Sequence, residues 1–139
     1  MIDPYQIYET KASGGDCILL IVAALDLEQL NDFSQLAEEL NLDVLIEVHS
    51  EEELNIALSI DPKLVGINNR DLTTFEVNKN LATELAKKIS KDVIVVSESG
   101  ISSREDIFFS KEQGIHSFLI GESFMREPSP GEALKKLIS

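Results

Sequence analysis

The sequence holds a single cysteine, Cys17, and no tryptophan. One cysteine cannot form an intrachain disulfide, and no cysteine cluster is available to bind zinc. Basic residues are also scarce, since 12 Lys and Arg stand against 25 Asp and Glu, giving a formal net charge of −13. That balance argues against a general nucleic-acid or anionic-membrane binder, because phosphates would be repelled at long range. It does not exclude a small phosphate held by backbone N–H groups, which carry no net charge.

No hydrophobic run reaches transmembrane length, and the chain does not open on a charged segment followed by an apolar run. We therefore expect a soluble cytoplasmic protein with no membrane partner and no nucleic-acid partner. The 139 residues, of which 43% are hydrophobic and 27% charged, suffice to bury a core without disulfides or metals. We expect one domain over residues 1–139, and we find no metal-ligand cluster and no sign of a cofactor.

Five short apolar runs, rich in Val, Ile and Leu and mostly without alternation, are spaced along the chain. They occupy residues 17–25, 44–48, 64–68, 93–97 and 117–121. Such runs are typical of parallel strands covered by helices. Their starts are 20 to 29 residues apart, which leaves room for one helix and two short loops each.

Helix-start and helix-stop signals fall between these runs. Asp3 followed by Pro4 predicts a helix that ends at Gly14-Gly15. Asp61-Pro62 and Gly114 predict two further helix ends. Amphipathic spacing predicts helices over 78–89 and about 130–138. Pairs that resemble capping boxes predict three more helix starts, at Asp26 with Gln29, Ser50 with Glu53 and Ser102 with Glu105.

Helices and strands are thus predicted to alternate, from a first helix through five strands to a last helix. Right-handed crossovers give such a chain a parallel sheet with helices outside. Two architectures satisfy this α/β order, an open doubly wound sheet and part of a (β/α)₈ TIM barrel. A full barrel needs about 200 or more residues, so the chain fits only part of one. Because it begins at a helix cap rather than a strand, we also expect an upstream segment to be missing.

In such folds, functional residues lie at the carboxyl ends of strands and in the loops that follow. Glu47 lies inside the apolar strand LIEVH, where an unpaired carboxylate would cost several kcal/mol to bury. It either faces a polar pocket or has a partner, and we weigh a functional carboxylate at even odds with a structural one. The stretch Asn68-Asn69-Arg70-Asp71 follows the third strand, and Arg70 offers a planar fork suited to a carboxylate. Taken alone, this stretch favours a polar turn with an Arg–Asp pair.

Glycines follow the fourth and fifth strands. Ser97-Glu98-Ser99-Gly100 ends the fourth, and Gly121 stands at the corresponding place after the fifth. A glycine lets the backbone approach an anion closely, and a helix starts soon after each. The pair therefore predicts a phosphate site like that formed after strands seven and eight of many barrels.

The remaining reactive side chains attract simpler interpretations. His49 follows Glu47 in a loop and His116 precedes the last strand, and we assign neither a role. Cys17 is expected to be a small buried residue. A receiver-like domain would need clustered Asp residues after the first strand, where Ala23-Ala24 stand instead.

Taken together, these segments resemble indole-3-glycerol phosphate synthase, a barrel lyase of tryptophan biosynthesis. The resemblance runs in the family's order over essentially the whole chain, and the motifs GINNRDL and VSESGI together are highly specific. The matching stretches are IDPYQIYE at 2–9, ILLIVAAL at 18–25, DVLIEVHSEEEL at 43–54, GINNRDLTTFEV at 66–77, VIVVSESGI at 93–101 and FLIGESFMR at 118–126.

The resemblance implies a role for several residues. It places the five strands as strands four to eight of the family's barrel and makes Glu47 the glutamate that takes part in proton transfer. Asn68 and Arg70 then hold the substrate, with Arg70 as the partner of its carboxylate. The ring pocket would be lined by Glu98 and Ser99, and the phosphate would be bound at Gly100, Gly121 and Glu122. Several family members have a small residue where Glu122 stands, which matters little if only its backbone is used.

The family's catalytic lysines and a further glutamate belong to strands one to three, and no residue here matches them. The family reaction closes a ring and then loses CO₂ and water, which requires a general acid. Lys11, Lys63 and the other lysines are predicted on helices or at the wrong strand ends. We therefore expect the chain alone to lack most or all of the activity.

Two functions remain open at this point. The chain is either part of the lyase that works with a complementary N-terminal half, or a non-catalytic half-barrel module that at most binds phosphate. In both cases the first and fifth strands leave open apolar edges, which favour pairing with another chain. We therefore expect a homo-oligomer, with two-fold dimers as the simplest form, or a complex with the complementary half.

Overall fold

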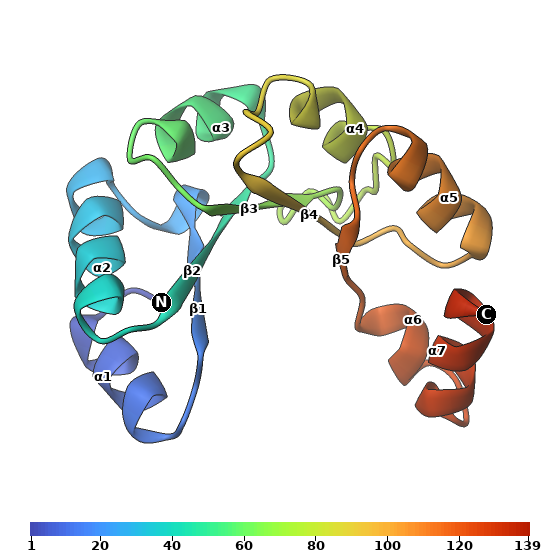
Figure 1. Cartoon of the computed structure of the whole chain (residues 1–139), viewed down its shortest axis with the longest axis horizontal. Helices are drawn as coiled ribbons and strands as arrows, with labels where there is room; N and C mark the ends of the chain where they lie inside the picture. Colours follow the sequence, from blue (N-terminus) through green and yellow to red (C-terminus); the bar gives the residue numbers. More distant parts are fainter. The chain divides into compact units, whose positions relative to one another are not determined.

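A computed structural model describes all residues, 1–139, and confirms the predicted alternation of helices and strands (Figure 1). The elements are α1 (Pro4–Ala12), β1 (Cys17–Ile21), the 3₁₀ helix η1 (Val22–Ala24), α2 (Leu27–Glu39), β2 (Asp43–Val48), α3 (Glu51–Leu58), β3 (Leu64–Asn68), α4 (Leu81–Ala86), β4 (Ile94–Glu98), α5 (Arg104–Glu112), β5 (Ser117–Leu119), α6 (Glu122–Met125) and α7 (Pro130–Ile138).

The strands form one five-stranded sheet in the order β1-β2-β3-β4-β5, with β1 and β5 at its edges. β1 and β2 are parallel, and their register sets Ile21 beside Glu47. β4 and β5 are also parallel, with Glu98 beside Leu119. Each strand thus pairs with its successor in sequence, as connections through an intervening helix produce.

The chain divides into two compact units. The first contains residues 1–66 and 90–94, and the second contains residues 67–89 and 95–139. Each unit is described by itself below.

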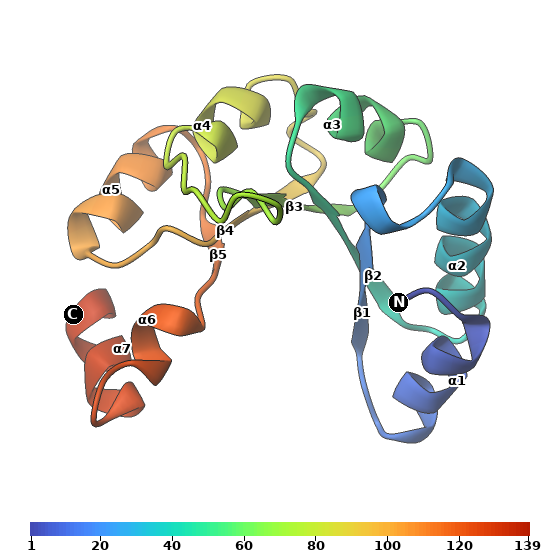
Figure 2. The same cartoon turned by 180° about the vertical axis from the view of Figure 1, so that it is seen from behind.

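In the first unit, α1 and α2 lie side by side along β1 and β2, as Figure 1 and the view from behind in Figure 2 both show. The helix α1 starts as predicted, because the Asp3 side chain accepts from the Tyr5 N–H (2.8 Å) and Gln6 completes the capping box. One face of β1 is buried through Ile18 and Leu20, at 2% and 0% exposure.

The apolar residues of α2 that face the core are Leu30, Phe33 and Ala37, which are spaced three and four residues apart on one helical face. Asp26 caps this helix by accepting from the Gln29 N–H (2.8 Å), and the predicted capping box is confirmed. Leu27, in the first turn of α2, is 54% exposed.

Two expectations for the first strand are wrong. The run 17–25 is a strand only to Ile21 and then turns into η1, where Ala23 and Ala24 are exposed. Cys17 is exposed rather than buried. Successive residues of a strand face opposite sides, so Cys17 lies on the face opposite to buried Ile18.

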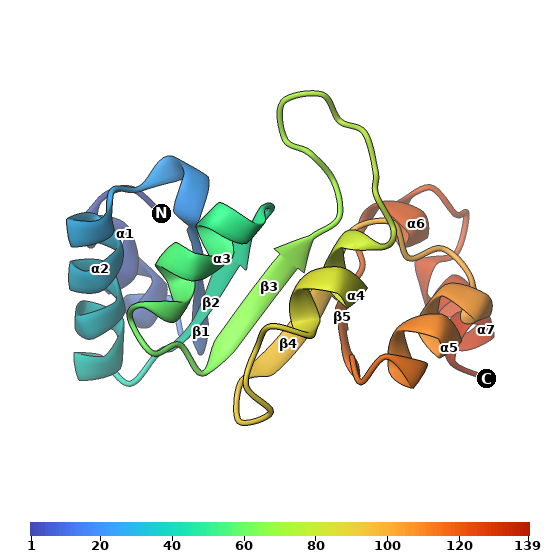
Figure 3. The same ribbon diagram turned by 90° about the horizontal axis from the view of Figure 1, so that it is seen from above.

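In the second unit, four helices accompany β4 and β5. The capping pair of α5 is Ser103 with Asp106, one residue beyond the predicted pair Ser102 and Glu105. The helix predicted over 78–89 is shorter, at Leu81–Ala86, and the short helix α6 starts directly after Gly121. The loop between β3 and α4 extends beyond the end of β3 (Figure 3).

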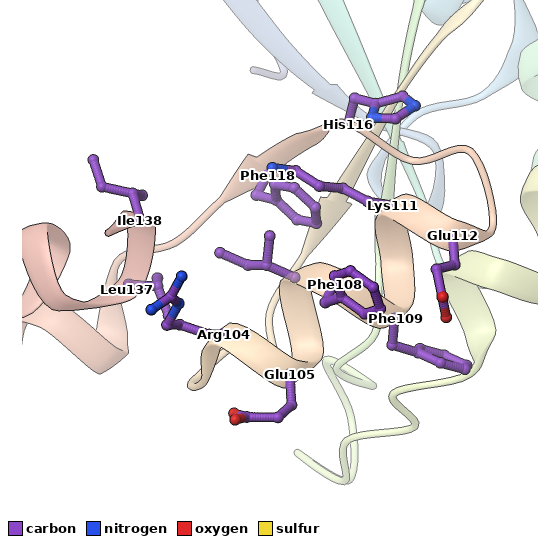
Figure 4. Close-up of a pocket in the computed structure, with 11 residues that line it drawn as sticks. Arg104, Glu105, Phe108, Phe109, Lys111, Glu112, His116, Phe118, Leu137 and Ile138 are labelled. Carbon is purple, nitrogen blue, oxygen red and sulfur yellow. The ribbon is translucent and has the colours of Figure 1, made fainter.

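A cavity of ≈ 630 Å³ lies among α5, β5 and α7 in this unit. Figure 4 shows Phe118 of β5 and Phe108 of α5 on its side nearer the sheet, with Leu137 and Ile138 of α7 across from them. Phe108 and Ile138 remain 64% and 69% exposed, so the helices leave apolar surface open here. None of the helices in either unit combines the length and the apolar character needed to cross a membrane.

Candidate functional site

Asn69 joins the carboxyl ends of β3 and β4 in the second unit. Its side-chain Nδ2 donates to the Ser97 hydroxyl and to the Ser99 carbonyl, both at 3.1 Å. Its Oδ1 accepts from the backbone N–H of Ala82 at 3.0 Å, which ties the start of α4 to the same point. Asn69 is 1% exposed, so these bonds satisfy a buried amide. The amide thereby fixes where the loops after both strands begin.

Arg70 extends from the loop after β3 toward α6. Its Nη2 lies 2.5 Å from Glu122 Oε2, and its Nη1 donates to the Phe75 carbonyl at 3.4 Å. Asn68 orients the backbone at this position, because its Oδ1 accepts from the Arg70 N–H at 3.0 Å. The other oxygen of Glu122, Oε1, lies 2.6 Å from Nη2 of Arg126. A single carboxylate therefore bridges two guanidinium groups.

The loop after β4 turns through two successive left-handed residues, Ser99 (φ 61°) and Gly100 (φ 74°). A Cβ on Gly100 would lie 2.8 Å from Cγ1 of Val77, so both the conformation and the space favour glycine. Gly121 differs, because its φ is −122° and a Cβ there would meet nothing within 4 Å. The open space beside Gly121 is room that a ligand could occupy.

Asp106 occupies the start of α5. Its Oδ2 accepts from the backbone N–H groups of Ser102 (2.9 Å) and Ser103 (3.0 Å), and its Oδ1 lies 2.8 Å from Nζ of Lys79. Burial works to raise the pKa of Asp106, but the bonds from Lys79 and Ser102 and the charge of Lys79 outweigh it and lower the pKa to about 2. Asp106 thus stays ionised and holds these two N–H groups itself.

A cavity of ≈ 400 Å³ lies at the carboxyl ends of β4 and β5, among these residues. Three cations, Arg70, Lys79 and Arg126, line it, against two carboxylates: Glu122 in the lining and Asp106, which pairs with Lys79. In a chain of net charge −13, this is a local cationic excess suited to an anionic ligand. Of the predicted residues, those that line the cavity are Arg70, Ser99, Gly100, Gly121 and Glu122.

Three other predicted residues are buried at strand ends. Asn68 is 7% exposed at the end of β3, and Glu98 is 2% exposed at the end of β4. Glu47 is 6% exposed and lies near the end of β2, in the first unit. No cluster of three or more His, Cys, Asp or Glu side chains could hold a metal ion.

Several residues that shape the site were missed in the sequence. Asn69 belongs to the polar stretch 68–71, for which the sequence indicates no role of this residue, although its amide bonds both the Ser97 hydroxyl and the Ala82 N–H. Arg126 stands four residues after Glu122, a helical spacing at which opposite charges pair. Lys79 and Asp106 are 27 residues apart, and no local pattern links them.

Comparison with known proteins places the chain beside one family. A family model described as indole-3-glycerol phosphate synthase matches residues 1–137. Curated proteins of that name from Delftia acidovorans and Chromobacterium violaceum are 52% and 50% identical, over 100% and 99% of this chain. A relative from Legionella pneumophila is 51% identical over 139 residues. The chain spans about half the length of these curated relatives, 52–54%.

Solved structures of other proteins share the fold at low identity. One of them is described as "Native KDPGal structure" and has a TM-score of 0.71 at 15% identity. The match covers 99% of this chain and 62% of that chain. KGPDC from Streptococcus mutans has a TM-score of 0.72 at 12% identity, and the match covers 98% of this chain and 65% of that chain. These neighbours are TIM-barrel proteins, and five parallel strands with surrounding helices are consistent with the predicted partial barrel.

Proposed function

Because the chain belongs to the indole-3-glycerol phosphate synthase family, we propose that residues 1–139 carry the substrate- and phosphate-binding part of a lyase. The proposed reaction closes the indole ring in tryptophan biosynthesis, with loss of CO₂ and water. The cytoplasm is the proposed place of this reaction. Its substrate is a small phosphorylated molecule that also bears a carboxylate.

The observation that carries this proposal is the cationic cavity at the strand ends of the second unit. Arg70, Lys79 and Arg126 surround it, Gly100 lies in its wall, and the space beside Gly121 is open. A guanidinium fork suits a carboxylate, and bare backbone beside cations suits a phosphate. Both anionic groups of the proposed substrate therefore find matching chemistry within one cavity.

Each predicted residue has a proposed task. Arg70 binds the substrate carboxylate, and Asn68 holds the Arg70 backbone in place through its bond to that N–H. Glu98 and Ser99 line the pocket of the aromatic ring. Phosphate is bound by the backbone at Gly100, Gly121 and Glu122, because the Glu122 side chain is itself an anion. Glu47 transfers a proton, and its burial on β2 is consistent with a carboxylate kept for that purpose.

The chain alone is proposed to be inactive or severely impaired. Ring closure and loss of hydroxide require a general acid, which the family resemblance assigns to lysines outside the stretches matched here. The lysine that lines the cavity, Lys79, is already bound to Asp106 at 2.8 Å. In this structure its ammonium is therefore directed at Asp106 rather than toward the cavity interior, so Lys79 is not proposed as the general acid.

The proposal is tested by turnover of carboxyphenylamino-deoxyribulose phosphate, followed through the fluorescence of the indole product. The chain has no tryptophan, so its own background is low. We expect no turnover by the 139 residues alone. Turnover should appear when they are mixed with the portion of the Delftia acidovorans relative that this chain does not cover.

A Glu47→Gln variant of the same mixture controls for a contaminating host enzyme and should be inactive. Turnover by the chain alone that disappears in Glu47→Gln would show that the chain supplies its own acid. Turnover that is unchanged in this variant would be assigned to a contaminating host enzyme rather than to this chain.

A second candidate function is a self-associating module that at most binds phosphate. It is favoured by apolar strand residues left open, since Ile94 of β4 and Leu119 of edge strand β5 are 56% and 52% exposed. Edge strands with apolar side chains favour pairing with another chain. Light scattering after gel filtration distinguishes the cases: a monomer that binds no hydrophobic dye would exclude this module.

A further inference from the structure

Glu122 holds an unusual position for an acidic residue, since its carboxylate lies in the anion-binding cavity itself. It pairs with Arg70 through Oε2 at 2.5 Å and with Arg126 through Oε1 at 2.6 Å. Each guanidinium thus has its own oxygen. The carboxylate occupies the place on Arg70 where a ligand oxyanion would bind.

Arg70 is the more restricted of the two arginines. Its side chain is 28% exposed and also donates to the Phe75 carbonyl, whereas the Arg126 side chain is 77% exposed. Glu122 and Arg126 stand four residues apart, so that pair can persist without Arg70. The Glu122 side chain is 51% exposed and has solvent into which it can turn.

We propose that Glu122 is an internal competitor, whose carboxylate must leave Arg70 before a carboxylate ligand can bind there. This inference rests on the proposed function, because it assumes that Arg70 binds the substrate carboxylate. On displacement, Glu122 keeps its bond to Arg126 and so loses only one of its two partners. The residue thereby sets the affinity of the site for carboxylates.

The competition predicts a modest, measurable effect. Ion pairs between partly exposed side chains are weak, so removing Glu122 from Arg70 frees only a small amount of binding energy. We expect Glu122→Gln to tighten carboxylate binding about three- to tenfold, because a neutral amide competes less well for the guanidinium. Phosphate binding at Gly100 and Gly121 should change less, since it uses backbone groups.

Anthranilate is the carboxylate probe, because it is fluorescent and the chain contains no tryptophan. Its binding is titrated with the full 139-residue chain, the Glu122→Gln variant and a control, Glu127→Gln. Glu127 is exposed, and the change removes the same charge from a residue that pairs with neither arginine. Inorganic phosphate is titrated in parallel by NMR, and circular dichroism verifies that each variant is folded.

Tighter anthranilate binding by Glu122→Gln but not by Glu127→Gln supports the competition. Equal affinities in all three proteins, with phosphate still bound, overturn it while leaving the proposed phosphate site in place. An equal gain in both variants also overturns it, because the gain would then follow from net charge alone. If neither anthranilate nor phosphate binds any of the three proteins, both the proposed binding site and the competition are wrong.

Discussion

Asn69 and Ser97, 28 residues apart in sequence, meet through a buried hydrogen bond of 3.1 Å from the Asn69 amide to the Ser97 hydroxyl. The same amide group serves Ser99 and Ala82, so one side chain connects the ends of β3 and β4 with the start of α4. The positions of Arg70 and Gly100 depend on this connection, since each lies one residue beyond a bonded position.

Replacing Asn69 with Ala should therefore destabilise the fold. The change leaves the Ala82 N–H without its acceptor in a buried setting, and each such group costs about 1–3 kcal/mol. We expect a loss of about 2–4 kcal/mol in the free energy of unfolding, measured by urea titration. The matched control, Asn55→Ala, removes an exposed asparagine of α3 and should change stability by less than about 0.5 kcal/mol. Equal losses in the two variants would contradict a structural role for Asn69.

Gly100 and Gly121 should respond differently to replacement by Ala. At Gly100, a φ of 74° and the nearby Val77 side chain should make the change cost about 1–2 kcal/mol of stability. At Gly121, where φ is −122° and space is open, stability should be nearly unchanged. Phosphate affinity should nevertheless fall in Gly121→Ala, because the methyl group fills the proposed binding space.

Urea titration and phosphate titration by NMR measure these two effects separately. Gly114→Ala supplies the control for strain alone, since Gly114 has a φ of 87° and a Cβ would meet nothing within 4 Å. A Gly121→Ala variant that is stable and binds phosphate as well as the parent chain would place the phosphate elsewhere.

The sequence predicted what is determined locally. Asp3 caps α1 with Pro4 as its first residue, within one turn, and the strand order follows from apolar runs spaced for helical crossovers. At α5, Ser102 and Ser103 are both possible caps, each followed three residues later by an acid. The start lies at Ser103, where Asp106 also meets Lys79, and that lysine is far away in sequence.

The site was less predictable, because its pairs are distant in sequence. The guanidinium of Arg70 pairs with Glu122, 52 residues away, a contact that the stretch 68–71 does not indicate. Asp71 stabilises the turn, accepting from the N–H groups of Thr73 (2.6 Å) and Thr74 (2.9 Å). No periodicity or spacing rule encodes a contact made only when separate strands align.

Asp106 should make stability depend on pH in acid. Its pKa is about 2 in the folded chain against an ordinary value of 3.8, so folding favours the ionised form. The resulting stability is fully present above about pH 5 and is lost as pH falls through 4 toward 2. We expect about 1 kcal/mol, because Lys79 is 54% exposed and its charge is screened.

Urea titrations between pH 2 and 6 measure this contribution in the parent chain and in Lys79→Gln. The variant should lose part of the acid-dependent stability, because it lacks the charge that holds the pKa of Asp106 down. The control, Lys87→Gln, removes an exposed lysine that is not among the groups lowering the pKa of Asp106 and should keep the parent profile. Identical profiles for Lys79→Gln and the parent would show that Lys79 does not lower this pKa.

The reactivity of Cys17, on edge strand β1, should depend on Asp43, which lies beside it on β2. Partial burial of the thiol raises its pKa; a backbone bond from Leu45 opposes this, and the carboxylate of Asp43 adds to it. Since the thiolate is the reactive form, alkylation by iodoacetamide at pH 8 should be slower in the folded chain than in urea. Asp43→Asn should accelerate it up to about threefold, because a nearby negative charge disfavours the thiolate.

The acceleration should shrink as the pH rises above the thiol pKa, where the thiolate is fully formed in both proteins. The control, Asp16→Asn, changes the acid adjacent to Cys17 in sequence, which does not face it across the strand pair. If both variants accelerate alkylation equally, the effect comes from general charge rather than from the β1–β2 register. A specific effect of Asp43 would confirm in solution that Cys17 and Asp43 are paired on neighbouring parallel strands, with β1 accessible at the edge of the sheet.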